Sequence, residues 1–113
     1  MSNDCLFCRI VRKEIPATIV AENGHCVAFR DITPQAPTHV LVIPRQHVAS
    51  LNEMKDANLL GQMQLLAAQI AKSEGLSERG YRTVINTNAD AGQTVFHIHL
   101  HLLAGRRMQW PPG

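Results

Sequence analysis

The chain has 113 residues, of which 45% are hydrophobic and 18% are charged, and its formal net charge is +2 with six histidines counted as neutral. This length fits one domain, and the composition is that of a folded globular protein, which excludes a disordered tail or a collagen-like repeat. The small charge and the absence of a Lys/Arg run disfavour a nucleic-acid-binding protein, and no stretch approaches the ~20 apolar residues of a membrane span.

The first residues have neither the basic start nor the apolar run of a signal peptide. We therefore expect a cytoplasmic protein, in which Cys5, Cys8 and Cys26 stay reduced. Three cysteines cannot all pair with one another, which also disfavours a disulfide framework.

The N-terminal part is predicted to form a short helix followed by a hairpin. Residues 5–14 can form the helix, with Asp4 as its N-cap, and a proline two residues later ends it. Residues 18–22 and 26–30 then read as two strands joined through a tight Asn-Gly turn.

The middle of the chain is predicted to hold a loop, a central strand and a long helix. Residues 31–37 contain two prolines and should be a loop, whereas residues 38–43 are β-branched and apolar, as in a central strand. Ser50 and Glu53 have the spacing of a capping box, and from there to Glu74 apolar residues recur at helical spacing.

The last part of the chain is predicted to supply two more strands. They cover residues 81–86 and 95–103, and a polar loop over residues 87–94 separates them. The expected fold of residues 1–113 is therefore one α+β domain, with a five-stranded, mainly antiparallel sheet, one long helix and one short helix.

The last predicted strand carries His97, His99 and His101 in alternation with apolar residues. Successive side chains of a strand point to opposite faces, so the three imidazoles would share one face while the other face packs a core. A neutral imidazole, with a pKa of ~6.5, is a good nucleophile near neutral pH. A phosphorylated imidazole can be hydrolysed by water, which splits one difficult step into two. These residues alone predict a histidine that attacks phosphorus; the alternatives are a metal-binding strand, a structural histidine or an accidental cluster.

A second candidate site begins with Cys5 and Cys8, whose Cys-x-x-Cys spacing is common among zinc ligands. A tetrahedral site needs two more ligands, and His47 and one histidine of residues 97–101 are available. The alternative is a pair of half-buried thiols that pack beside Phe7.

Four segments of the chain together resemble the histidine triad (HIT) superfamily. Residues 97–101 have its His-Φ-His-Φ-His form, where Φ is apolar, and residues 31–44 resemble its upstream signature. Residues 92–97 and 110–113 are similar to the Hint branch in particular. The resemblance runs from about residue 5 to the end, and it implies a homodimer in which two five-stranded sheets join into one of ten strands.

The resemblance also implies roles for the histidines. His99 would be the nucleophile that forms a covalent nucleotidyl-imidazole, which water then hydrolyses. His101 would contact the phosphate and help to fix the nucleophile, and His39 would complete the catalytic set through a hydrogen bond that steadies His99. The other implied nucleotide contacts are Asp31 to the ribose hydroxyls, Ile32 beside the base, and Asn86, Gly92, Gln93 and Thr94 around the phosphate and leaving group. For the loop residues among these, the alternative is turn chemistry.

The resemblance further implies a structural zinc ion and no organic cofactor. The implied zinc ligands are Cys5, Cys8, His47 and His97. Hint proteins with a similar ending often lack the cysteine pair, and they commonly carry serine where Thr94 stands. The tail of about residues 104–113, with Trp110, is implied to reach toward a partner's active site and shape substrate preference. The alternative for Trp110 is packing against its own subunit.

The implied activity is that of a purine nucleoside phosphoramidase. It would cleave the P–N bond of adenosine 5′-monophosphoramidate or a similar compound and give AMP, or GMP, and an amine. One alternative is a dinucleoside polyphosphate hydrolase, which the Hint-like ending disfavours. The other is a zinc- or nucleotide-binding regulatory protein whose catalysis is incidental.

Overall fold

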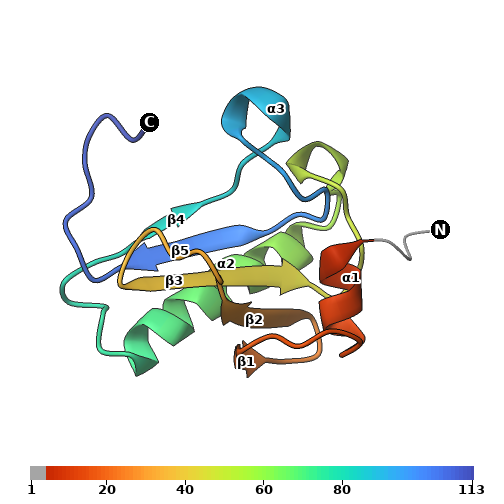
Figure 1. Ribbon diagram of the computed structural model, residues 1–113, viewed down its shortest axis with the longest axis horizontal. Coiled ribbons are helices and arrows are strands. Elements are labelled where there is room, and N and C mark those ends of the chain that lie inside the picture. Colours follow the sequence, from red (N-terminus) through yellow and green to blue (C-terminus); the bar gives the residue numbers. More distant parts are fainter. Residues whose placement is uncertain (1–4) are drawn as a thin grey trace.

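The computed structural model describes residues 5–113 and shows a five-stranded antiparallel sheet with helices on both faces (Figure 1). The strand order across the sheet is β1-β2-β3-β5-β4. The strands are β1 (Ile19–Glu22), β2 (Cys26–Arg30), β3 (Thr38–Pro44), β4 (Arg82–Val84) and β5 (Leu100–Ala104). The helices are α1 (Leu6–Val11), α2 (Ala57–Ser73), the one-turn α3 (Asn88–Ala91) and the 3-10 turn η2 (Leu51–Glu53). The predicted α+β fold is therefore confirmed.

The central strand β3 is buried on both faces because a different helix covers each face. Val40 and Val42 belong to the larger core cluster, which the apolar side of α2 completes. Leu41 and Ile43 point the other way, into a smaller cluster that includes Phe7 of α1. Full burial of an apolar side chain of this size contributes roughly 1.5–3 kcal/mol, so a continuous apolar run is what this position in the sheet requires.

Both predicted helices begin differently from the expectation. Asp56 caps α2, since its carboxylate accepts the Leu59 N–H at 3.0 Å. Ser50 and Glu53 do bond to each other, at 2.6 Å, but they close η2 and not the long helix. Helix α1 is shorter than predicted, and the Cys5 thiol occupies its N-cap; the predicted cap, Asp4, lies outside the described residues.

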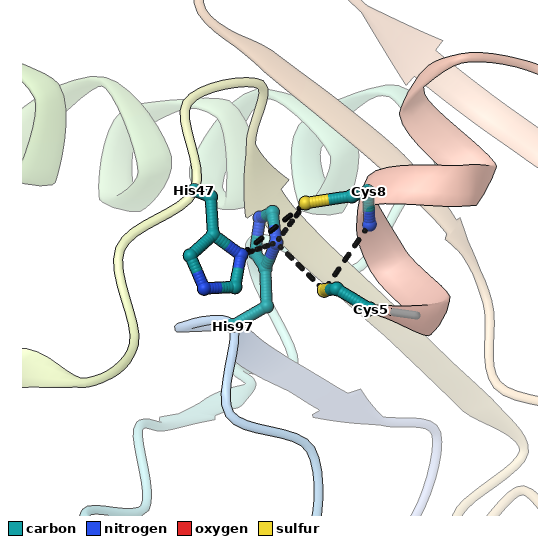
Figure 2. A group of neighbouring side chains, drawn as sticks. All are labelled: Cys5, Cys8, His47 and His97. Carbon is teal, nitrogen blue, oxygen red and sulfur yellow. Dashed lines mark hydrogen bonds between the residues drawn. The ribbon is translucent and has the colours of Figure 1, made fainter. Parts of the chain in front are cut away.

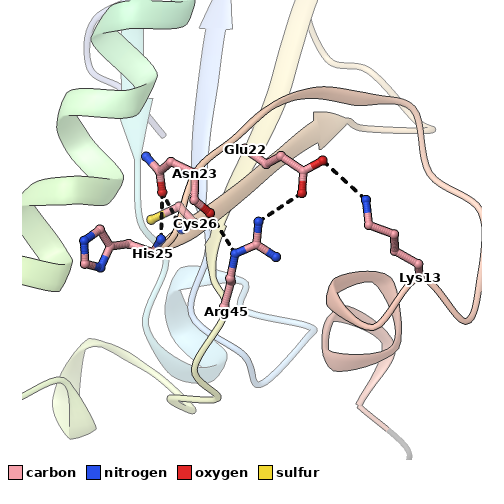
Figure 3. Close-up of polar contacts among 6 residues, drawn as sticks. All are labelled: Lys13, Glu22, Asn23, His25, Cys26 and Arg45. Atoms are coloured by element: carbon pink, nitrogen blue, oxygen red, sulfur yellow. Dashed lines mark hydrogen bonds and ion pairs between the residues drawn. The ribbon is translucent and has the colours of Figure 1, made fainter.

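The β1–β2 hairpin turns where the Asn-Gly pair was predicted. The Asn23 side chain accepts the backbone N–H groups of His25 and Cys26 at 2.8 and 2.9 Å (Figure 3). This side chain stands in for a backbone turn, which is why asparagine suits the position.

Charged side chains connect the hairpin to two other segments (Figure 3). Arg45, just after β3, donates to the Asn23 carbonyl at 2.8 Å and to the Glu22 carboxylate at 2.9 Å. The other Glu22 oxygen accepts from Lys13, beyond the end of α1, at 3.3 Å. The network therefore ties the segment that follows β3 to the segment that follows α1.

The last strand is shorter than predicted. β5 begins at Leu100, although the prediction began it at residue 95. In the β3–β5 register Pro44 would face Ile98, and proline has no N–H to donate to the ladder. The Ile98 N–H itself donates to the Val48 carbonyl at 2.7 Å, in another segment.

The other predicted strand ends agree with the structure within two residues. The predicted loop over residues 87–94 contains α3, which ends at Gly92 with a φ of 91°. Among residues 5–113, none of the helices has the length and apolar character needed to cross a membrane.

Candidate active site and metal centre

The His99 side chain is held by a single backbone group immediately before β5. Its Nδ1 lies 2.9 Å from the His97 carbonyl oxygen. Because a carbonyl can only accept, Nδ1 carries the ring proton and Nε2 keeps its lone pair. Burial lowers the pKa of His99, against the opposing effects of this hydrogen bond and of Asp31. The ring is therefore a neutral imidazole whose free nitrogen is Nε2.

His39 and His101 form a second, directed pair across β3 and β5. The Gln35 backbone N–H donates to His39 Nδ1 at 3.0 Å, so the neutral His39 ring carries its proton on Nε2. This Nε2–H donates to His101 Nδ1 at 2.9 Å. Asp31 Oδ2 also lies 3.5 Å from His39 Nε2. His101 Nδ1 is then an acceptor, and its own proton lies on Nε2.

The expectation that His39 steadies His99 by a hydrogen bond is wrong. His39 pairs with Leu103 in the β3–β5 register, so His101 is its diagonal neighbour and His99 is one step farther along the strand. His39 therefore acts on His101, while the His97 carbonyl orients His99. The rings of His99 and His101 still lie side by side, with centroids 5.0 Å apart.

A pocket of about 290 Å³ opens beside these two rings. Five of the predicted site residues line it: Asp31, Ile32, Thr94, His99 and His101. The rest of its wall is mostly apolar and comes from α1, the segment after it and β2, with Leu41 of β3 and Val95 before β5. Ligand pockets of ~300–1,000 Å³ are typically built in this way, with a few polar groups on apolar walls.

Helix α1 contributes to this wall, which the sequence did not predict. Phe7 lies between the two cysteines, lines the pocket and meets the His99 ring edge-to-face, with centroids 5.0 Å apart. The centroid of the Phe7 ring also lies 6.0 Å from that of the His97 ring. The only sequence feature that pointed to Phe7 as a pocket residue was its place between Cys5 and Cys8. That feature is equally consistent with a phenylalanine that packs in the core.

Three predicted phosphate contacts do not line the pocket. Gln93 is buried, and its amide accepts from the Asn88 N–H and donates to the Ala49 and Val95 carbonyls, so it holds the loop together. Gly92 supplies the left-handed end of α3. Asn86 is half-buried before that helix. Turn chemistry accounts for Gln93 and Gly92, and a phosphate role for these three residues stays a prediction.

The C-terminal tail lies away from this pocket. Trp110 is 81% exposed, and the Arg82 guanidinium of β4 stands 5.9 Å from its ring centroid. In the single chain the tail therefore lies against its own subunit. A role in a partner's site stays a prediction.

The four predicted metal ligands converge on one point (Figure 2). Their ligating atoms lie within 4.8 Å of one another, although α1, the segment after β3 and the segment before β5 supply them. His97 Nδ1 lies 3.4 Å from Cys5 Sγ, 3.5 Å from Cys8 Sγ and 3.3 Å from His47 Nδ1. Cys8 Sγ and His47 Nδ1 are 3.2 Å apart.

These distances fit a tetrahedral ion. Zinc bonds of ~2.0–2.1 Å to nitrogen and ~2.3 Å to sulfur give tetrahedral edges of about 3.3 Å between two nitrogens and about 3.5 Å between nitrogen and sulfur. His97 Nε2 donates to the Pro44 carbonyl at 2.8 Å, which leaves the Nδ1 lone pair directed at the cluster. Burial lowers the pKa of His97 to about 4, so the ring is neutral as a ligand must be.

A second group has the residue types of a metal site but not the proton arrangement. The ligating atoms of Asp31, His39 and His101 also lie within 4.8 Å of one another. His39 would have to bind through Nε2, and that atom carries the ring proton because Nδ1 accepts from Gln35. We therefore assign this group to hydrogen bonding.

Comparisons with known proteins agree with this geometry. A family model described as the HIT domain matches residues 12–108. An uncharacterised HIT-like protein of Synechococcus elongatus is 56% identical over 115 residues, which cover 100% of both chains. The structure of a HIT family hydrolase from Legionella pneumophila matches with a TM-score of 0.94 and 56% identity, over 96% of this chain and 99% of that one. A histidine triad nucleotide-binding protein from Candida albicans matches with a TM-score of 0.83 and 33% identity, over 95% and 82% of the two chains.

Proposed function

Because the chain belongs to the HIT domain family, we propose that it hydrolyses purine nucleoside 5′-phosphoramidates, with His99 as the nucleophile. The substrate would be adenosine 5′-monophosphoramidate or a similar compound, and the products AMP, or GMP, and an amine. The observation that carries this proposal is the hydrogen bond from His99 Nδ1 to the His97 carbonyl, because it leaves a lone pair on Nε2 beside the pocket.

The reaction would proceed in two displacements. His99 Nε2 forms a bond to the α-phosphorus while the P–N bond breaks, and the leaving amine takes one proton from the solvent, which the attacking water of the second displacement returns. Water then attacks the same phosphorus, the bond to the imidazole breaks and neutral His99 returns. The buried, neutral state of His99 favours the first step because a protonated ring has no lone pair to offer.

His101 would stabilise the charge that develops on the phosphoryl oxygens. Its Nδ1 accepts from His39, so Nε2–H is the ring donor that remains for a ligand. A donor already in place in a site with little water stabilises such charge strongly. His39 is a positioning residue in this scheme, since it acts on the reaction through His101.

The remaining pocket residues suit a nucleoside. Asp31 Oδ1 already accepts the Thr33 N–H at 2.8 Å, and an ionised carboxylate has further lone pairs for two ribose hydroxyls. Ile32, which is 97% exposed, would close over the base, and the Thr94 hydroxyl would lie near the leaving group. The name of the Candida albicans relative, a nucleotide-binding protein, supports a nucleotide here.

A zinc ion fits the cluster of two cysteines and two histidines, and its place would be structural. When bound, zinc supplies a cross-link between α1 and the segments that hold His47 and His97, and no water position is needed in a site with four protein ligands. Such a link would hold Phe7 against His99. Thiol ligands are also consistent with the reducing cytoplasm that the sequence predicts.

We further propose that the working form is a homodimer. Strand β4 is an edge of the sheet, and Leu65, Tyr81 and Trp110 leave large apolar side chains exposed. Pairing at this edge would join two sheets, as the family resemblance implies. Light scattering should give twice the 12.5 kDa mass of the chain, and a value equal to that mass would contradict the dimer.

Steady-state kinetics with two substrate types tests the proposed activity. We expect kcat/KM for adenosine 5′-phosphoramidate to exceed that for diadenosine polyphosphates, and the His99→Ala variant to lose turnover while it stays folded. A preference for the dinucleotide would make the protein a polyphosphate hydrolase. Turnover that survives in His99→Ala would contradict the nucleophile.

A further inference from the structure

Beyond the histidines, the hydrogen bonds continue from His39 to the surface of the molecule. The Gln35 backbone N–H donates to His39 Nδ1, and it is this bond that decides which nitrogen of His39 carries the proton. If Gln35 moved away, nothing would keep the proton off Nδ1; Asp31 would still favour Nε2, from which its Oδ2 lies 3.5 Å, but the donor to His101 would be lost in part of the molecules. The position of the Gln35 backbone therefore determines whether His39 can donate a hydrogen bond to His101.

Arg106 holds that backbone in place. It lies two residues after β5, and its Nε and Nη2 both donate to the Gln35 carbonyl, at 3.2 and 3.0 Å. Hydrogen bonds from a charged donor are roughly twice as strong as neutral ones, and a planar guanidinium fixes orientation as well as distance. Arg106 therefore follows directly on the strand that carries His101, and it holds the backbone group that fixes the donor to that histidine.

A second contact keeps Arg106 and the loop of residues 31–37 together. Gly105 packs so closely on Pro37 that an added Cβ would lie 2.8 Å from the Pro37 Cβ. Its φ of 94° also belongs to the left-handed region that glycine adopts without strain. The loop is therefore seated on the end of β5 at the point where Arg106 leaves the strand.

We propose that Arg106 is a positioning residue that fixes the ring tautomers of His39 and His101 through the Gln35 backbone. Each link is a directed hydrogen bond: the guanidinium to the Gln35 carbonyl, the Gln35 N–H to His39 Nδ1, and His39 Nε2–H to His101 Nδ1. The result is a proton on His101 Nε2, the ring nitrogen that remains for a ligand of the pocket that His101 lines. The catalytic part of this inference rests on the proposed hydrolase function; the tautomer part does not.

The test compares Arg106→Ala with Arg107→Ala, a matched control at the neighbouring exposed arginine, whose side chain makes no hydrogen bond or ion pair that we observe among residues 5–113. The ¹⁵N signals of the histidine rings in the free protein report the tautomers. We expect wild type and Arg107→Ala to hold His39 and His101 protonated at Nε2, and Arg106→Ala to show mixed tautomers at both.

The kinetic readout separates positioning from substrate binding. With adenosine 5′-phosphoramidate we expect Arg106→Ala to lower kcat roughly tenfold with KM changed less than about twofold, because the geometry of the transition state is disturbed and not ground-state binding. Arg106→Lys should recover part of the loss. Arg106→Met, which keeps an apolar stem but no donor, takes the place of the alanine variant if thermal unfolding shows that variant to be unfolded.

Unchanged ring tautomers, or a wild-type kcat, in the folded Arg106 variant would overturn the inference. If the wild-type protein does not hydrolyse the phosphoramidate at all, the proposed function fails, and the ring signals still decide whether Arg106 sets the tautomers.

Discussion

Three histidines of one sequence motif differ in what their rings can do, because each ring has a different first partner. His97 donates through Nε2 to a carbonyl and directs Nδ1 at the metal cluster. His99 donates through Nδ1 to a carbonyl and leaves Nε2 free. His101 accepts at Nδ1 and keeps its proton on Nε2. One ring thus suits a ligand, one a nucleophile and one a donor, although the side chains are chemically identical.

The buried state of His101 predicts how stability depends on pH. Burial, with the neighbouring His99 and His39, lowers the pKa of His101 to about 4, below its ordinary value of ~6.5 in an unfolded chain. The unfolded state therefore binds a proton that the folded state does not, and stability falls as the pH falls from about 6.5 toward 4.

We expect the free energy of unfolding of wild type to drop across this range by on the order of 2 kcal/mol more than that of His101→Asn, which cannot titrate at this position. Denaturant titrations at several pH values measure both proteins. Parallel curves would show that His101 does not carry the effect.

At the scale of elements, local patterns predicted the existence of strands and helices better than their ends. Alternation and β-branching identified β3, and the helical period identified α2. The capping box at Ser50 was real but belonged to η2, because Asp56 offered a second cap six residues later. The start of β5 could not be read locally, since Pro44 on another strand ends the ladder.

Gly105 offers a test of how strictly the loop of residues 31–37 is seated on β5. Gly105→Ala would add a Cβ 2.8 Å from Pro37 at a φ of 94°, so we expect a loss of roughly 1–3 kcal/mol in stability. Gly61→Ala is the control: this position is helical with nothing within 4 Å, and alanine there should stabilise by about 0.4–1 kcal/mol. Equal effects in the two variants would contradict the close contact.

At the scale of the whole molecule, the candidate metal centre and the candidate active site share two parts of the chain. Residues 97–99 pass from a candidate metal ligand to the proposed nucleophile, and α1 with its N-cap carries the two cysteines and Phe7, which lines the pocket. The sequence and the family resemblance named the four residues of the metal cluster and five residues that line the pocket, but not Phe7. It could not predict which ring nitrogen faces which partner, because Gln35, Pro44 and the His97 carbonyl act through their backbones.

The metal prediction concerns occupancy and stability together. We expect one zinc ion per chain by elemental analysis, and a lower Tm after chelation, because the ion links segments far apart in sequence. Cys8→Ser should lose the zinc, whereas Cys26→Ala should keep it, since Cys26 lies in the core away from the cluster. Equal zinc content in these two variants would contradict the assigned ligands.

The most direct measurement is to trap the covalent intermediate and locate it in the chain. The protein is mixed with adenosine 5′-phosphoramidate, quenched within the first turnovers and mapped by peptide mass spectrometry. The account predicts one AMP group per active chain, attached to His99, and none in His99→Ala. An adduct on a different residue, or turnover with no dependence on His99, would contradict it.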